Sequence, residues 1–132
     1  MARKAQVAVE VMSYYALLLL VFLVTLFLIV NNQRSVNEER INMDAQRLLM
    51  LSKNEIDIAA KVGDGYSNSF VLPGALEGGA NYTMAVNTYF QQVYIEYNQQ
   101  NVSLPLLTSN ITGTFGKGTI TIRNSGGMII LA

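Results

Sequence analysis

The chain has 132 residues, about the size of one domain, and its nine basic and nine acidic side chains give a formal net charge of zero. Nucleic-acid-binding proteins carry a basic patch, often interleaved with aromatic residues, and this sequence shows none, so no nucleic-acid partner is expected. The chain also has no Cys and no His. This composition excludes disulfides, Cys/His zinc sites and His-based nucleophilic triads, so we expect no metal site, no cofactor and no enzymatic activity.

The N-terminus combines a short basic segment, Met1–Ala5, with an apolar run from Val11 to Val30 that contains no charged residue. As a helix, this run of about 20 residues would cross a hydrocarbon core of ~30 Å, and no second run of this kind follows. Asn31–Val36 lacks the small-residue cleavage site of a secretory signal peptide. Because positive residues favour the cytoplasmic side, we expect the N-terminus inside the cell and the C-terminal part outside.

A single glutamate, Glu10, stands at the beginning of the apolar run. A carboxylate that enters hydrocarbon costs on the order of 2.5–3.5 kcal/mol on insertion scales, so it should be paired, protonated or close to the interface. Composition alone also allows an interfacial glutamate whose side chain reaches water. Tyr14 and Tyr15 also allow two interpretations. Their hydroxyl groups either bond between helices in a filament or lie in an aromatic belt at the membrane interface.

The residues around Glu10 occur in a more specific order. The segment Lys4–Glu10, followed at once by the apolar run, resembles the class III signal peptide of archaeal type IV pilin precursors. The resemblance implies that a membrane-bound prepilin peptidase cuts between Ala5 and Gln6. Glu10 then becomes the fifth mature residue, and the resemblance implies that its carboxylate pairs with the α-amino group of Gln6 on a neighbouring subunit.

This resemblance implies a structural subunit of an extracellular type IV pilus-like filament, a homopolymer built through the hydrophobic helix. It also implies a pilus assembly ATPase and a platform membrane protein as partners, with the precursor held in the cell membrane before assembly. The alternative is a single-pass, membrane-anchored extracellular binding or adhesion module that does not polymerise and keeps its leader. A third class, an ectoenzyme that uses carboxylates alone, has no sequence feature in its favour.

The predicted helix continues well beyond the membrane segment. Asn31–Val62 contains no Pro and no Gly, and its apolar positions follow the three–four spacing of an amphipathic helix. These positions are Ile41, Ala45, Leu48, Ala59 and Val62. Gly63–Gly65 is a stop signal, because glycine adopts the left-handed conformation that follows many helices. We expect a continuous helix over residues 6–62, with 6–30 in the membrane or filament core and 31–62 as an amphipathic stalk.

After Gly65 the apolar period changes to two, which predicts a small extracellular β-domain over residues 66–132. The predicted strands are Asn81–Asn87, Phe90–Tyr97, Gly118–Arg123 and Met128–Leu131, with weaker candidates at Ser67–Leu72 and Val102–Leu107. Because about 65 residues bury little core of their own, we expect the strands to dock on the helix. The expected fold class is α+β: a long N-terminal hydrophobic and amphipathic helix followed by a small antiparallel β-domain, as in type IV pilins.

Three segments of the predicted outer domain match the N-glycosylation pattern Asn-x-Ser/Thr. Their acceptor residues are Asn81, Asn101 and Asn110. A chain rich in Asn, Ser and Thr also shows such matches by chance, so glycosylation and simple solvation of these polar residues stay open as alternatives.

Overall fold

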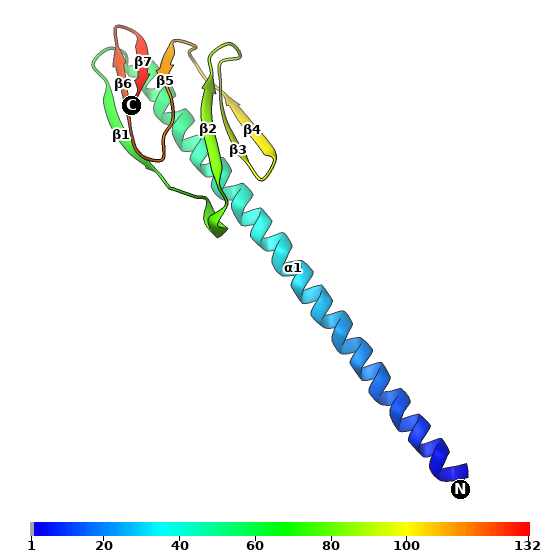
Figure 1. Ribbon diagram of the computed structural model, residues 1–132. Coiled ribbons are helices and arrows are strands. Elements are labelled where there is room, and N and C mark those ends of the chain that lie inside the picture. The colour runs from blue at the N-terminus through cyan, green and yellow to red at the C-terminus, as the bar shows by residue number, and fades with distance from the viewer. Residues whose placement is uncertain (1) are drawn as a thin grey trace. The chain divides into compact units, whose positions relative to one another are not determined.

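The structure, a computed structural model, describes the backbone of residues 2–132 and the side chains of residue 7 and residues 9–132. The chain divides into two compact units, Met1–Glu38 and Glu39–Ala132. One helix, α1 (Ala2–Val62), supplies the described part of the first unit and the beginning of the second (Figure 1). Because β-sheets follow this long N-terminal helix, the fold class is α+β, a layout consistent with a type IV pilin-like fold.

In the described part of the first unit, α1 carries apolar side chains on all sides, and none of these described side chains is buried within the chain. The exposed fraction of its large apolar side chains between residues 9 and 30 ranges from 42% at Leu26 to 76% at Met12. Two hydroxyl side chains of the apolar run bond back to the helix: Ser13 Oγ donates to Val9 O and Thr25 Oγ1 to Val21 O, both at 2.8 Å. Both hydroxyls are therefore satisfied without water, as an apolar medium requires.

In the second unit, one face of α1 is buried. Ala45, Leu49 and Ile56 are fully buried at spacings of four and seven residues, which confirms the predicted amphipathic character. Val62 was expected on this face, but that prediction is wrong: Val62 is 63% exposed, because this last helical residue lies beside the buried stripe. The predicted helix end is confirmed, since Gly63 follows with a φ of 86° and its N–H donates to Ala59 O.

Within residues 67–132, seven strands form two sheets. A four-stranded sheet has the order β1-β6-β7-β5, and a three-stranded sheet has the order β2-β3-β4. The strands are β1 (Ser67–Leu72), β2 (Tyr82–Asn87), β3 (Gln92–Tyr97), β4 (Gln100–Pro105), β5 (Ile111–Gly113), β6 (Gly118–Ser125) and β7 (Met128–Leu131). A short 3-10 turn, η1 (Glu77–Gly79), precedes β2. All six segments predicted as strands overlap strands of the structure, although β4 ends at Pro105 and so excludes Leu106 and Leu107 of the predicted segment Val102–Leu107.

The β6–β7 hairpin is the local element that the sequence specifies best. Ser125 pairs with Met128, so Gly126 and Gly127 form a two-residue turn, with φ values of 58° and 83°. Two successive positive φ angles are the geometry that joins twisted antiparallel strands tightly, and two glycines adopt it without strain.

One pairing departs from the expected antiparallel arrangement: β5 pairs with β7 in parallel. β5 has only three residues, so period-two alternation gives no signal for it. Gly113 ends the strand with a φ of 99°, and a Cβ at this position would lie 2.1 Å from Leu131 O. The parallel pairing therefore depends on a glycine at position 113, where the two backbones approach closely.

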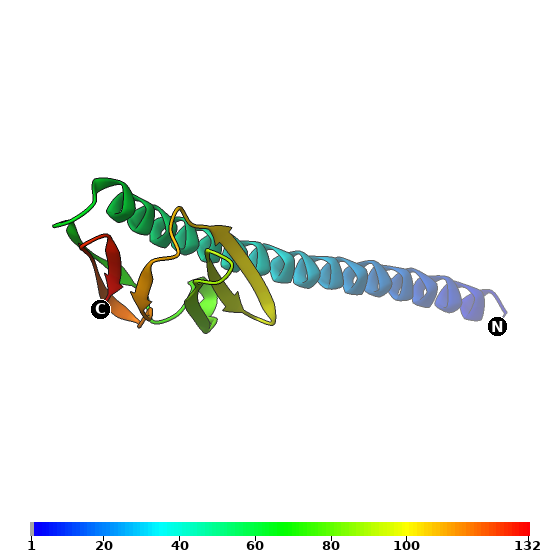
Figure 2. The same cartoon turned by 90° about the horizontal axis from the view of Figure 1, so that it is seen from above.

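Both sheets lie on the same side of the second-unit part of α1 (Figures 1 and 2), and their inner faces share one core with it. Strand β3 shows the pattern clearly, because Val93, Ile95 and Tyr97 are buried and the residues between them are not. The fully buried side chains of the strands include Leu72, Ile122 and Ile129, which meet Leu49 and Ile56 of the helix in this core. Docking of the strands on the helix is thus confirmed.

Candidate functional site

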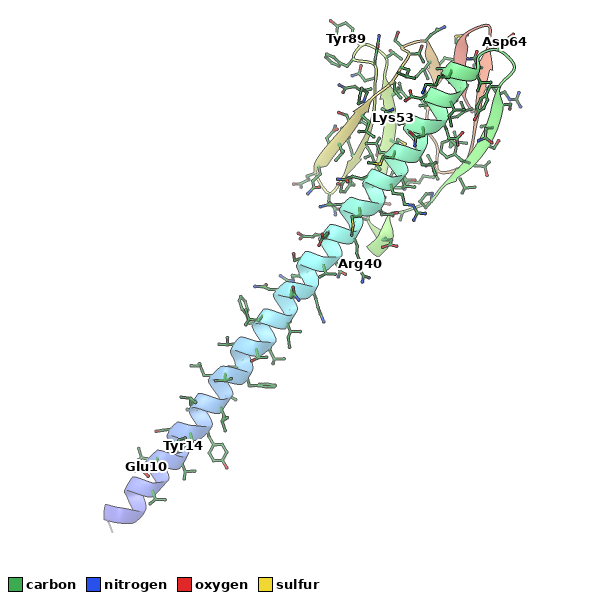
Figure 3. All side chains as sticks on the ribbon, turned by 180° about the vertical axis from the view of Figure 1, so that it is seen from behind. Glu10, Tyr14, Arg40, Lys53, Asp64 and Tyr89 are labelled. Atoms are coloured by element: carbon green, nitrogen blue, oxygen red, sulfur yellow. The ribbon has the colours of Figure 1, made fainter. Side chains whose placement is uncertain are left out.

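The predicted leader cleavage site, between Ala5 and Gln6, lies outside the residues whose side chains the structure describes. Glu10 is described, and it is exposed on α1, where it lies close to Tyr14 (Figure 3). Among the described residues, none donates a hydrogen bond to Glu10 or forms an ion pair with it. Its carboxylate therefore meets no counter-charge from the described part of its own chain.

The first part of α1 has the properties of a membrane-spanning helix. Its most apolar window of 18 residues has a mean hydropathy of 2.6, and none of that window is buried within the chain. Tyr14 and Tyr15 are 71% and 70% exposed, so their phenol groups meet no covering element of this chain. A long apolar helix of this kind could anchor the chain in a membrane.

A second exposed apolar surface occurs on α1 within the second unit, and the sequence analysis missed it. It consists of a row of residues at spacings of three and four, which we call the outer helix face. The members of this row are Met43, Arg47, Met50, Asn54 and Ile58. Met43, Met50 and Ile58 are 56%, 53% and 43% exposed. The spacing of the two methionines and the isoleucine was a usable signal, although only the structure shows that the sheets cover the opposite side of the helix.

Two polar side chains attach the strands to α1. The Asp57 carboxylate, 7% exposed, accepts a hydrogen bond from the Leu107 N–H at 3.0 Å and pairs with Lys53. Asn124, 5% exposed, donates from Nδ2 to Ala59 O at 2.8 Å and accepts the Gly127 N–H at 3.0 Å. Both residues therefore have structural partners.

A third attachment joins the end of α1 to the first strand. Glu55 accepts hydrogen bonds from the Tyr66 hydroxyl at 3.0 Å and from Asn68 Nδ2 at 2.8 Å. Burial raises the pKa of Tyr66 above its ordinary value, and the hydrogen bond and negative charge of Glu55 add to this effect. Tyr66 consequently stays a hydrogen-bond donor over a wider pH range.

The three predicted glycosylation acceptors are exposed, but the structure distinguishes their amide nitrogens. Asn101 Nδ2 donates to Glu96 Oε1 at 3.0 Å, and Asn110 Nδ2 donates to Gly127 O at 3.0 Å. Asn81 uses only its oxygen, which accepts from Lys117 Nζ at 3.4 Å, and its Nδ2 has no partner among the described residues. Of the three, Asn81 therefore presents the most accessible nitrogen for glycan transfer.

A hollow of about 420 Å³ lies at the β3–β4 turn and includes two of the acceptors in its lining. Glu96 is the one charged residue of that lining, and it already accepts from Asn101. Across the described residues, no group of three or more Asp or Glu side chains is placed to hold a metal ion. The hollow thus offers amide and hydroxyl groups but no paired acid and base.

Comparison of the chain with models of protein families found no match, and comparisons with curated proteins and with solved structures found none either.

Proposed function

We propose that the chain is a structural subunit of an extracellular type IV pilus-like filament, assembled through α1 after removal of residues 1–5. The precursor is held in the cell membrane with its leader in the cytoplasm and its C-terminal domain outside. A prepilin peptidase, an assembly ATPase and a platform membrane protein are the proposed partners. The proposed role is structural and involves no catalysis.

The outer helix face is the observation that carries this proposal. A bilayer requires about 20 apolar residues, and Val11–Val30 already supplies them. Met50 and Ile58 follow much later in α1, yet they are about half exposed. A simple membrane anchor would leave the apolar side chains of this face in water, whereas packing against other copies of α1 would cover them.

Glu10 adds support from the other end of α1. An exposed carboxylate at the start of an apolar helix requires a partner in a dry environment, and the described part of the chain provides none. In a polymer of identical helices, the new α-amino group of Gln6 on a neighbouring copy would be such a partner. Each subunit would then be set in register by one pairing of opposite charges.

The first test is the mass of the mature N-terminus, measured after expression in a host that has an archaeal prepilin peptidase. The proposal expects a chain that begins at Gln6, together with filaments visible by electron microscopy. An intact leader without filaments would favour the alternative, a membrane-anchored extracellular adhesion module that does not polymerise.

A second test uses Glu10→Ala, which we expect to insert into the membrane normally but to yield few filaments. Removing the carboxylate leaves the α-amino group of the neighbouring copy without its counter-charge inside the apolar assembly. The matched control is Glu38→Ala, an exposed glutamate of the same helix outside the apolar run. Filament counts for Glu10→Ala equal to those of the control would argue against the pairing.

A further inference from the structure

Four connections of the second unit meet at one end of the domain (Figures 1 and 3). They are residues 63–66 after α1, 88–91 between β2 and β3, 106–110 between β4 and β5, and 126–127 between β6 and β7, and we call them the tip surface. Hydrogen bonds join them: Leu106 N–H to Gln91 O (2.7 Å), Asn110 Nδ2 to Gly127 O (3.0 Å) and Gly126 N–H to Asp64 Oδ1 (2.7 Å). The tip surface is thus continuous and held in place by the fold.

Two adjacent aromatic rings project from this surface. Tyr89 is 87% exposed and Phe90 is 63% exposed, and their ring centroids lie 4.9 Å apart at an interplanar angle of 86°. Asn87 Oδ1 accepts the Phe90 N–H at 3.1 Å, which fixes the backbone of the turn, and Gln91 adopts a φ of 52°. The backbone that carries these rings is therefore already ordered before a ligand contacts them, which lowers the entropic cost of binding.

The charge of the tip surface points to a neutral ligand. Connections 88–91 and 106–110 contain no charged residue. Asp64 is the one charged residue of the four connections, and its carboxylate already accepts the Gly126 N–H. Thr88 and Gln91 flank the two aromatic residues in sequence, Ser109 lies in connection 106–110, and all three are exposed and offer both hydrogen-bond donors and acceptors. An anionic lipid or a phosphate group would find no cation in these connections.

The size of the aromatic surface argues against a folded protein as the ligand. Burial of one aromatic side chain removes roughly 150–250 Å² from water, so two rings supply about 300–500 Å². Leu107, 58% exposed, is the other exposed large apolar side chain of these connections. The remaining exposed residues of connections 88–91 and 106–110 are polar and neutral, which suits a small ligand with many hydroxyl groups better than the apolar centre of a protein interface.

We propose that the tip surface binds neutral saccharides. The C–H face of a sugar ring would lie against Tyr89 and Phe90, and the sugar hydroxyls would bond to the neighbouring hydroxyl and amide groups. The inference rests on the proposed filament for its strength, because one such site binds weakly. Many copies along one filament raise the overall affinity, by about 10²–10⁴-fold for two linked sites that engage together.

The test is co-sedimentation of purified filaments with three insoluble neutral polysaccharides: cellulose, cross-linked dextran and mannan. We expect wild-type filaments to be retained by at least one of them and to be released by soluble fragments of the same polysaccharide. The double variant Tyr89→Ser, Phe90→Ser should be retained at least tenfold less. Val71→Ser, a change of a 67% exposed side chain on β1, is the matched control and should behave as wild type.

The same comparison with the full-length chain in detergent, coupled to beads at equal density, separates this inference from filament formation. If the coated beads bind a polysaccharide but the chain forms no filaments, the proposed filament is rejected and the saccharide site remains supported. Absence of wild-type retention on all three polysaccharides would overturn the inference, as would equal retention of the double variant. Retention on phosphatidylcholine vesicles alone would assign the rings to a lipid surface, and loss of filaments in the double variant would assign them to a contact between subunits.

Discussion

Tyr82 is one of the few side chains of the core that can titrate. Its hydroxyl donates to Pro73 O at 2.6 Å, and Lys117 Nζ lies 5.4 Å from its ring centroid. Burial raises the pKa of Tyr82 above its ordinary value of 10.0, and the Asp44 carboxylate adds to the effect. The folded state therefore favours the neutral phenol, which is also the form that donates the hydrogen bond.

From this shift we predict loss of stability at alkaline pH. The folded pKa lies above that of the unfolded chain, so the contribution is fully present below about pH 10 and is lost as the pH rises through the folded value. Tyr82→Phe should lower the free energy of unfolding by ~1 kcal/mol at neutral pH, because the bond to Pro73 is lost, and should make the alkaline decline shallower. Thermal unfolding of the detergent-solubilised chain between pH 7 and pH 11 measures both effects.

The control is Tyr94→Phe, which removes a phenolic hydroxyl from the outer face of β3 rather than from the core. An unchanged decline in Tyr82→Phe would show that other groups cause the alkaline loss.

The three acceptor asparagines give a second prediction at this scale. In a host that glycosylates Asn-x-Ser/Thr, we expect the highest occupancy at Asn81, because the amide nitrogens of Asn101 and Asn110 are engaged by Glu96 and Gly127. Intact-mass analysis should show that Asn81→Gln removes most of the added glycan mass. Asn110→Gln should remove little, and a chain glycosylated mainly at Asn110 would mean that modification precedes folding.

At the residue scale, the sequence did not reveal the hydrogen bonds that join α1 to the rest of the domain. Asp57 and Leu107 are 50 positions apart and Asn124 and Ala59 are 65 apart, so their bonds exist only once both sheets have docked on α1. Asn124 directly follows the predicted strand Gly118–Arg123, and it accepts the Gly127 N–H at the β6–β7 turn. Its second role, satisfying the carbonyl of Ala59 in the last turn of α1, has no local sequence signal.

At the scale of elements, features that depend on local chemistry were predictable. The end of α1 follows from the Gly63–Gly65 stop signal, and the β6–β7 turn follows from Gly126 and Gly127. The parallel β5–β7 pairing was not predictable, since it depends on a three-residue strand and on the close approach of Gly113 to Leu131. The outer helix face required knowledge of which side of α1 the sheets cover.

The outer helix face also gives the prediction that belongs to this scale. Met50→Ser and Ile58→Ser should change the free energy of unfolding by only about 0.5 kcal/mol, because both side chains are largely exposed. If neighbouring copies bury these side chains in a filament, each substitution removes on the order of 1.5–3 kcal/mol of association free energy per contact. The critical concentration for filament assembly should then rise about tenfold or more.

Sedimentation separates assembled from unassembled protein and so measures this critical concentration. Gln46→Ser, another exposed position of α1, is the matched control and should assemble as wild type. Unchanged assembly of both serine variants would remove the main support for packing of this face in a polymer.

At the scale of the whole molecule, the described part of the first unit contributes no residue to the hydrophobic core, whose described members all lie in the second unit. Core residues of α1 begin at Ala45 and continue to Ala59, so the last part of the helix is as much a part of the domain as the strands are. The two units thus differ in what stabilises them: internal packing for Glu39–Ala132, and an apolar environment or other helices for the described part of Met1–Glu38.

This division predicts that the fragment 39–132 folds alone. It retains the whole core, including Leu49 and both attachments of the strands to the helix through Asp57 and Asn124. We expect a cooperative thermal transition and dispersed amide signals in nuclear magnetic resonance spectra, without detergent. The shorter fragment 53–132 lacks Leu49, whose loss alone, by analogy with truncation to alanine, should cost about 2–5 kcal/mol.

Because small domains are stable by only about 5–15 kcal/mol, and because fragment 53–132 also loses Ala45 and Leu48, it should be unfolded. Folding of this shorter fragment would show that the two sheets suffice without the helix. Failure of fragment 39–132 to fold, with the full-length chain folded in detergent, would show that the domain depends on the apolar half of α1. Success of the longer fragment and failure of the shorter one would place the boundary of the folding unit within α1, between the residues that require an apolar environment and those that form the core.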